Sequence, residues 1–147
     1  MNRTLFLPRL LVFFQFAALF IIMFSGPLIA SNILLKLVQV SSAIIGIWAI
    51  IIMHIGNFNI VPIPVKNAVF VTKGPYRLIR HPMYTSLFLF TLPELIGDFS
   101  YIRLLAFAFM AITLLYKLRY EEKLLLEKFD EYEHYMTKTK RIIPYIF

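Results

Sequence analysis

The run of residues 37–55 constrains the fold of this chain most, because it contains no Asp, Glu, Lys or Arg. A helix that crosses the roughly 30 Å hydrocarbon core of a bilayer needs about 20 consecutive apolar residues, and this run supplies them. Hydrophobic residues make up 60% of the chain and charged residues 16%, whereas an average soluble domain carries about 25% charged residues. The sequence therefore predicts an all-α integral membrane protein and excludes a soluble globular domain.

Three further apolar segments complete a predicted set of four transmembrane helices. The first of the four is interrupted by Pro8, Arg9 and Gln15, and the third has Pro93 and Glu94 near its far end. Basic residues lie near the ends of the first and fourth, as Arg9, Arg103 and Lys117 do, and their long side chains can reach the headgroups. A chain of 147 residues has room for one membrane-embedded domain, which we expect to cover residues 1–147. The predicted spans are residues 5–24, 37–55, 82–96 and 99–118.

Lysine and arginine are distributed unevenly over the segments that connect these spans. The link 25–31 contains none, whereas the loop 56–81 and the tail 119–147 contain several each. Basic residues collect on the cytoplasmic side, so both termini are predicted to be cytoplasmic, in the inner or plasma membrane of a prokaryote or the endoplasmic reticulum of a eukaryote. The net charge of +7 then fits membrane lipids with anionic headgroups, and no nucleic-acid partner is predicted.

The two cytoplasmic segments are more than connectors. The loop 56–81 is long, and its prolines predict a fixed extended path. Residues 120–135 of the tail place apolar side chains at helical spacing among acidic ones, which predicts an amphipathic helix that packs back on the bundle.

The loop ends in a segment, 74–84, that concentrates arginine, histidine, tyrosine and proline at the membrane surface. Pro82 suits the first turn of a helix, so His81 is expected near a helix N-terminus. Unpaired backbone N–H groups there favour an anionic group, and Arg80 reinforces the preference. The alternative is a basic stop signal followed by an ordinary helix start.

Two adjacent carboxylates, Glu121 and Glu122, directly follow the last predicted span. They can complement a helix dipole and pair with lysine four residues away, as Lys117 with Glu121. Alternatively, one of them reaches a polar cavity under the bundle and holds a cationic or hydroxylated ligand.

Taken together, these features resemble the isoprenylcysteine carboxyl methyltransferase and phospholipid methyltransferase superfamily. The resemblance rests on Gly-Pro-Tyr and Arg-His-Pro-Met-Tyr within 74–84, on the later Glu121-Glu122 pair, and on the tail 129–144. It implies an integral membrane methyltransferase that uses S-adenosylmethionine (SAM) and has no Rossmann domain. The cofactor-binding residues that it implies are Ala68, Val69, Phe70, Val71, Tyr76, His81, Pro82, Met83, Tyr84 and Glu121.

The same resemblance places Lys117 at a substrate-binding position where the prenylcysteine enzymes have arginine. Ser86 and Asp130 stand where the family usually has glycine. Methyl transfer is an in-line displacement that requires the acceptor close to the methyl group. The catalytic candidates are Arg80, His81 and Glu122, with Arg80 or His81 holding the cofactor carboxylate and His81 or Glu122 serving as a base where the acceptor must lose a proton.

The acceptor is expected to be a lipidic or small hydrophobic molecule that enters from the bilayer. A phospholipid amine and an isoprenylcysteine-type carboxylate or thiol both remain open at this point. Two other functions also remain open: an NADPH-dependent membrane reductase of the sterol type, whose motifs are similar, and a non-enzymatic membrane scaffold.

Other ionisable residues give weaker signals. We expect Glu94 to be solvated or paired with Arg103, His54 to lie at the interface, and His134 to be solvated. Three scattered histidines do not provide the spacing of metal ligands, so no metal site is predicted.

Overall fold

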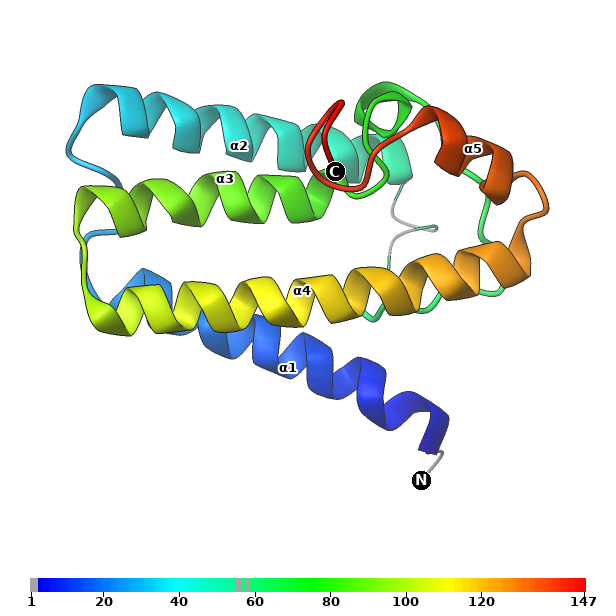
Figure 1. Cartoon of the computed structure of the whole chain (residues 1–147), viewed down its shortest axis with the longest axis horizontal. Helices are drawn as coiled ribbons and strands as arrows, with labels where there is room; N and C mark the ends of the chain where they lie inside the picture. Colours follow the sequence, from blue (N-terminus) through cyan, green and yellow to red (C-terminus); the bar gives the residue numbers. More distant parts are fainter. Residues whose placement is uncertain (1–2, 55–56, 58) are drawn as a thin grey trace.

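The computed structural model describes residues 3–54, 57 and 59–147, and all its long elements are helices (Figure 1). Four of them match the predicted spans and confirm the all-α class. The expected end of the second span at Ile55, and loop residues Gly56 and Phe58, lie outside the described residues. The elements are α1 (Arg3–Phe24), α2 (Ile33–Met53), the 3₁₀ turn η1 (Gly74–Arg77), α3 (Pro82–Gly97), α4 (Tyr101–Lys128) and α5 (Tyr132–Lys138).

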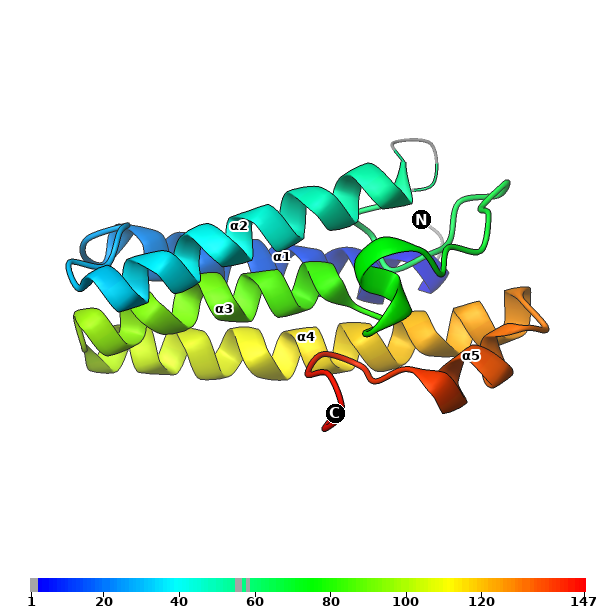
Figure 2. The ribbon, with the colours of Figure 1, turned by 90° about the horizontal axis from the view of Figure 1, so that it is seen from above.

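The four long helices lie side by side along the long axis of the molecule (Figures 1 and 2). α1 packs mainly against α4, and α2 packs mainly against α3. The short links 25–32 and 98–100 turn at one end, which we call the link end. α1 begins at the opposite end, where the described part of the loop 54–81 and α5 also gather (Figure 1). We call this the loop end.

The surface of α2 shows why these helices suit a membrane. Its buried residues are small or polar, whereas large apolar residues such as Ile44, Ile47 and Ile51 are exposed. A water-soluble helix has the opposite arrangement, with its apolar stripe toward the core. Helices α1, α2 and α4 are long and apolar enough to cross a membrane. The integral membrane assignment is therefore supported by which faces are covered as well as by composition.

Helix α3 agrees closely with the predicted span 82–96, whereas α4 is longer than the predicted span 99–118. α3 has 16 residues, or about 24 Å at 1.5 Å per residue, so its crossing of the membrane stays a prediction. α4 has 28 residues, or about 42 Å, which exceeds the hydrocarbon thickness. Its last turns, from Arg119 onward, therefore extend beyond the apolar span at the loop end.

The prediction of a single amphipathic helix over residues 120–135 is wrong in its boundaries. α4 continues without interruption to Lys128, where the helix ends, and α5 begins at Tyr132. Phe129 adopts an extended backbone conformation, and its ring stacks on Phe70 with centroids 5.3 Å apart. Packing of this ring against the loop replaces the helical continuation, which a helical periodicity alone does not reveal. The expectation that the tail packs back on the bundle is confirmed by this contact.

Helices α2 and α3 approach closely at Ser86, the position where glycine was expected. A Cβ added at Gly46 of α2 would lie 2.8 Å from Ser86 Oγ of α3. The small residue that permits the approach is thus on α2, opposite Ser86.

The link end contains a polar cluster, formed by the buried residues Gln39, Glu94 and Arg103 and by the exposed Asp98. The Arg103 guanidinium is fully buried and donates hydrogen bonds to the carbonyl oxygens of Glu94, Asp98 and Pro27 and to Ser25 Oγ. It also forms an ion pair with Asp98 at 3.2 Å. Carbonyl groups at a helix C-terminus lack intrahelical partners, so Arg103 caps α3.

The expectation that Glu94 is solvated or paired with Arg103 is wrong. The Glu94 side chain is 1% exposed, and its Oε1 accepts a hydrogen bond from Gln39 Nε2 at 3.3 Å. Arg103 instead binds the main-chain carbonyl of Glu94, because the guanidinium is directed at the end of α3. The expectations for the histidines are confirmed in exposure, since His54 and His134 are both exposed.

Candidate functional site

The 3₁₀ turn η1 fixes the start of the motif segment against α2. Gly74 has a φ of +58°, a left-handed conformation that favours glycine. A Cβ at this position would also lie 2.9 Å from Cγ1 of Ile52 in α2. Pro75 then occupies the second position of the turn, and Tyr76, which follows it, is buried. The Gly-Pro-Tyr sequence is therefore required by close packing of the loop on α2.

His81 immediately precedes α3, and Pro82 is the first residue of the helix, as predicted. The His81 side chain makes no capping hydrogen bond, so the imidazole is directed elsewhere. Its ring stacks on the Tyr84 ring, with centroids 5.2 Å apart and planes 2° from parallel. This stacking sets the direction in which both rings face the cavity described below.

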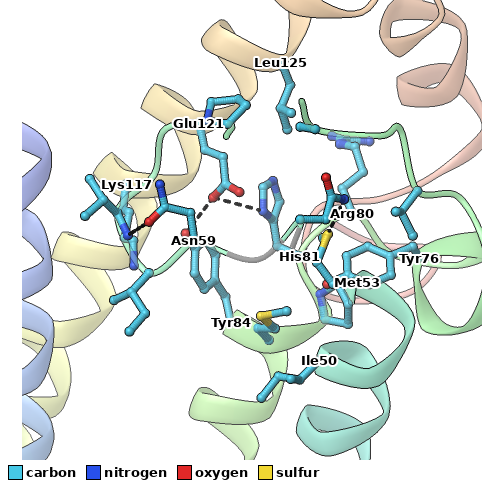
Figure 3. Close-up of a pocket in the computed structure, with 18 of the residues that line it drawn as sticks. Ile50, Met53, Asn59, Tyr76, Arg80, His81, Tyr84, Lys117, Glu121 and Leu125 are labelled. Atoms are coloured by element: carbon cyan, nitrogen blue, oxygen red, sulfur yellow. Dashed lines mark hydrogen bonds and ion pairs between the residues drawn. The ribbon is translucent and has the colours of Figure 1, made fainter. Parts of the chain in front are cut away.

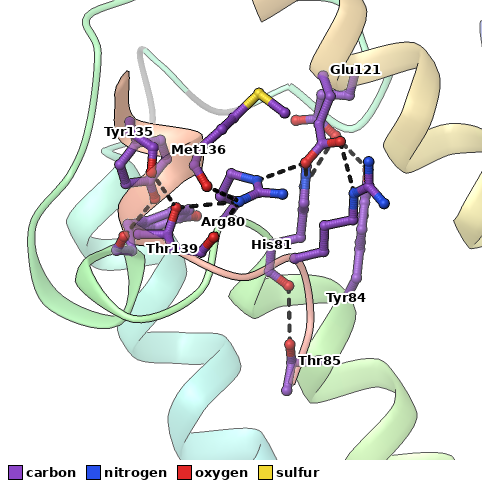
Figure 4. A network of polar contacts seen from close by, with 11 residues as sticks. Arg80, His81, Tyr84, Thr85, Glu121, Tyr135, Met136 and Thr139 are labelled. Carbon is purple, nitrogen blue, oxygen red and sulfur yellow. Dashed lines mark hydrogen bonds and ion pairs between the residues drawn. The ribbon is translucent and has the colours of Figure 1, made fainter. Parts of the chain in front are cut away.

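The C-terminal tail anchors the loop that carries Arg80 and His81. The main-chain N–H groups of these two residues donate to the carbonyl oxygens of Lys140 at 2.7 Å and Arg141 at 3.0 Å. The Arg80 guanidinium donates to the carbonyl oxygens of Met136 and Thr139 as well (Figure 4). The tail therefore occupies the N–H groups of Arg80 and His81, and an anion site at the N-terminus of α3 stays a prediction.

Glu122 is the centre of a buried ion-pair network. Its Oε1 accepts from Arg80 Nε at 2.7 Å and its Oε2 accepts from Arg141 Nε at 3.0 Å. His81 Nε2 lies 3.5 Å from Oε1 without the alignment of a hydrogen bond. Burial by itself raises the pKa of Glu122, but the close approach of the His81 imidazole and the hydrogen bond and charge of Arg80 outweigh it and lower the pKa to about 2.

Glu121 lies one position earlier in α4 and has a more open environment. Its side chain is 29% exposed, and its Oε2 accepts a hydrogen bond from the Tyr84 hydroxyl at 2.6 Å. Among the described residues, this is the only hydrogen bond that its carboxylate receives, although His81 Nδ1 approaches Oε2 to 3.9 Å. The two adjacent glutamates therefore differ: Glu122 is saturated by arginine, and Glu121 keeps acceptor capacity on the cavity side.

A cavity of about 370 Å³ joins these polar groups to the membrane-depth part of the bundle (Figure 3). This volume lies within the range of about 300–1,000 Å³ typical of small-molecule sites. Every candidate site residue from the sequence except Glu122 lines it. Those lining residues are Ala68, Val69, Phe70, Val71, Tyr76, Arg80, His81, Pro82, Met83, Tyr84, Lys117 and Glu121.

Aromatic side chains form the wall of the cavity between the loop and the tail. Phe70 contacts the rings of Phe129, Tyr132 and Tyr135, and the Tyr135 hydroxyl donates to the carbonyl oxygen of Tyr76. Burial raises the pKa of Tyr135 to about 12. Burial raises the pKa values of Tyr76 and Tyr132 by more than that of Tyr135. These phenols therefore remain neutral at physiological pH and provide flat apolar surface with hydrogen-bonding ends.

The predicted lining segment 68–71 is held mainly through its backbone. The Asn57 amide pairs with both main-chain groups of Val69, at 2.8 and 2.9 Å. The Val69 side chain is 71% exposed, so this residue borders the cavity at its rim. Lys128, at the end of α4, donates to the carbonyl oxygens of Val65 and Lys66 and holds the preceding part of the loop.

Sequence reasoning missed the residues that α1 and α2 contribute to the cavity. Gln15, Phe16 and Leu19 of α1 line it, as do Ile50 and Met53 of α2. Apolar lining residues in a membrane helix have no signature in a single sequence, because lipid-facing positions have the same composition. Gln15 did carry a signal, as the polar interruption of an otherwise apolar run.

Lys117 connects the two parts of the cavity. Its Nζ donates to Gln15 Oε1 at 2.7 Å and lies 5.3 Å from the centroid of the Tyr84 ring. The side chain is 3% exposed. The pairing with Glu121 that its spacing of four residues offered is not formed, because Lys117 extends toward α1 instead.

Comparison with known proteins agrees with the motifs and the fold. A comparison with curated proteins finds no match. The sequence profile of the isoprenylcysteine carboxyl methyltransferase (ICMT) family matches residues 34–127, well over half of the chain. The matched range contains α2, the loop, α3 and α4 with the Glu121-Glu122 pair. This chain belongs to the isoprenylcysteine carboxyl methyltransferase family.

Proposed function

We propose that this protein transfers a methyl group from SAM to the anionic reacting group of a hydrophobic acceptor within the membrane. The observation that carries the proposal is the continuity of the cavity. Its loop end presents Glu121, His81 and tyrosines, and its deeper part is lined by apolar residues of α1 and α2. A polar cofactor and an apolar acceptor can therefore occupy one cavity from opposite ends.

The loop end of the cavity fits the chemical groups of SAM. The Glu121 carboxylate has remaining acceptor capacity for an ammonium group or ribose hydroxyls. The rings of Phe70 and Tyr76 line the same cavity and offer flat surfaces for an adenine. When bound, SAM supplies an electrophilic methyl group, and the residues described here position it. The charge distribution predicts that this end faces the cytoplasm.

The deeper part of the cavity fits an acceptor with an apolar chain. Phe16 of α1 and Ile50 of α2 line the cavity and are also 50% and 42% exposed on the outer surface. The cavity is therefore accessible from the region that lipid occupies, and a prenyl or acyl chain can reach it laterally. The buried ammonium of Lys117 lies in the same cavity and favours a reacting group that is negatively charged.

A carboxylate or thiolate acceptor attacks the methyl group directly and requires no general base. Glu122 is unsuited to that role, because a carboxylate with a pKa of about 2 is a weak base and arginines engage both of its oxygens. We therefore assign Glu122 and Arg80 to positioning His81 and the tail.

A second candidate acceptor is the amine of a phospholipid headgroup, which must lose a proton before it attacks. The observation that favours it is His81 Nε2, which is buried without a hydrogen-bond partner among the described residues. His81 lines the cavity, and an imidazole is the side chain that most often serves as a general base. Against this candidate, the Lys117 ammonium disfavours a second cation close by.

The test is methyl transfer by the purified full-length protein in lipid nanodiscs, with methyl-labelled SAM. N-acetyl-S-farnesylcysteine and a phosphatidylethanolamine are the two acceptor probes. We expect label in the organic phase that is released by base, as from a methyl ester. Label in a headgroup amine would instead support the second candidate. Transfer to neither probe, together with no binding of SAM, would contradict the proposed function.

A further inference from the structure

Gln15 is a buried amide in the middle of the apolar helix α1. Gln15 is only 6% exposed, and its neighbours along the helix are mostly Phe, Ala and Leu. An amide at membrane depth is unfavourable unless its polar atoms are bonded. Its Oε1 accepts the hydrogen bond from Lys117 Nζ at 2.7 Å, which joins α1 to α4 at the level of the cavity.

The Lys117 ammonium remains uncompensated by this contact. An ammonium has three N–H donors, and among the described residues Gln15 is the one side-chain acceptor of Lys117. No described carboxylate lies within 4.0 Å of Nζ. The nearby Tyr84 ring stabilises the cation through its π face without accepting a proton. Lys117 therefore has N–H donors available toward the cavity.

The neutrality of Gln15 is what leaves the charge available. A carboxylate at position 15 would form an ion pair with Lys117 and cancel its field, whereas an amide oxygen fixes the ammonium in place and adds no charge. Gln15 and Lys117 both line the cavity, at the junction of its polar and apolar parts. Figure 3 shows Lys117 directed across the cavity from the same helix as Glu121.

Building on the proposed function, we propose that Gln15 is a positioning residue that holds Lys117 as the anion-binding group for the acceptor. By this assignment, α1 selects acceptors whose reacting group is a carboxylate or another anion. The residue lies outside the range 34–127 that matches the family profile. The anion-binding Lys117 lies within that range, whereas the residue that positions it does not.

The test is binding of two probes to the full-length protein in nanodiscs without SAM, measured by isothermal titration calorimetry. The probes are N-acetyl-S-farnesylcysteine and its carboxamide, which differ by one charge. We expect the wild-type protein to bind the carboxylate about tenfold more tightly than the carboxamide, as for one charge-assisted hydrogen bond. Gln15→Glu should abolish this preference, and Gln15→Leu should reduce it several-fold by releasing Lys117.

Gln39→Leu is the matched control, because Gln39 is also a buried glutamine in a membrane helix but lies at the link end. It should lower thermal stability and leave the preference for the carboxylate unchanged. A wild-type protein that binds both probes equally would overturn the proposal. A full preference for the carboxylate that is retained in Gln15→Leu would also overturn it. This second variant tests the proposal even where Gln15→Glu does not fold. Since SAM is absent from the titration, a failure to bind SAM would count against the proposed function alone.

Discussion

The two ends of the helix bundle each contain a cluster of polar and charged side chains, but among the described residues only the cluster at the loop end lines the cavity. At the link end, Arg103 is engaged by main-chain carbonyls and Asp98, and none of the four members of that cluster lines the described cavity. At the loop end, Glu121 and Lys117 line the cavity and keep hydrogen-bonding capacity toward it. Burial of charge in a membrane bundle is therefore compatible with either role, and the remaining capacity beside a cavity distinguishes the functional end.

The adjacent glutamates repeat this contrast within one turn of α4. Glu122 faces Arg80 and Arg141 and fastens the tail to the loop. Glu121 faces the cavity and receives a single hydrogen bond from Tyr84 among the residues described. One residue of separation on a helix rotates the side chain by about 100°, which is enough to place one carboxylate in the scaffold and the other in the site.

The largest effect on stability is expected from Arg103→Met. The substitution removes the hydrogen bonds that cap α3 and hold the link 25–32, and it leaves buried carbonyl groups and Asp98 without their partner. Each buried carbonyl group that is left without its donor costs about 1–3 kcal/mol, and Arg103 donates to several of them, whereas the exposed Asp98 adds little. Thermal unfolding in detergent should show the loss. A stability equal to that of the wild-type protein would contradict the structural role of the link end.

Glu122→Gln should destabilise the loop end by a somewhat smaller amount, about 2–4 kcal/mol, because Arg80 and Arg141 lose the charge that they share. The tail should detach first, and limited proteolysis after Lys138, Lys140 or Arg141 should report it. Lys123→Gln is the matched control on the exposed face of the same helix turn. Equal proteolysis of the two variants would contradict the role of Glu122.

The effect of Glu122 should also depend on pH. Its pKa is lowered from 4.5 to about 2 in the folded protein, so the ionised form contributes stability above pH 4.5. This contribution is lost as the pH falls from 4.5 through about 2. The difference in melting temperature between wild type and Glu122→Gln should therefore shrink across this interval. A difference in melting temperature that stays constant down to the lowest pH would show that the neighbours of Glu122 do not lower its pKa.

Gly74→Ala should have a smaller effect, about 1–3 kcal/mol, from the left-handed φ and the contact with Ile52. The displaced turn η1 carries Tyr76, so SAM affinity should fall together with stability. The double variant Gly74→Ala, Ile52→Ala tests the cause, because it removes the steric contact and keeps the backbone strain. No partial recovery in the double variant would assign the whole effect to backbone strain.

The smallest effect is expected from Lys128→Gln, which removes the ammonium that holds the loop carbonyls of Val65 and Lys66. Lys128 is exposed, so the change in stability should be within about 0.5 kcal/mol. Hydrogen exchange of the amides in 65–69 should increase, with exchange in α3 unchanged. Identical exchange in both variants would show that the aromatic contact of Phe70 suffices to hold the loop.

Sequence patterns were sufficient for the helices and for the residues of the loop end. Hydropathy located α1, α2 and α4, and the Gly-Pro-Tyr and His-Pro motifs marked the turn and the helix start that the structure has. The motif segment and Glu121 indeed meet in one cavity. These features were predictable because they depend on local backbone chemistry and on the length of an apolar run.

The partners of buried polar side chains were not predictable in the same way. Helical spacing predicted that Lys117 pairs with Glu121, but Lys117 donates a hydrogen bond to Gln15. Opposite charge predicted that Glu94 pairs with Arg103, but Arg103 donates to main-chain carbonyl groups. These contacts depend on which helices pack together, and a single sequence contains no direct signal for helix pairing. The break at Phe129 has the same origin, since the ring packs on a loop residue far away in the chain.

The measurement that tests the central claim most directly is the dissociation constant of SAM for three proteins in nanodiscs: wild type, Glu121→Gln and Gln39→Leu. We predict that SAM binds the wild-type protein, that Glu121→Gln weakens binding by tenfold or more through loss of the charged acceptor, and that Gln39→Leu changes stability without changing affinity. Undiminished binding by Glu121→Gln, or an equal loss in both variants, would contradict the assignment of the loop end as the cofactor site.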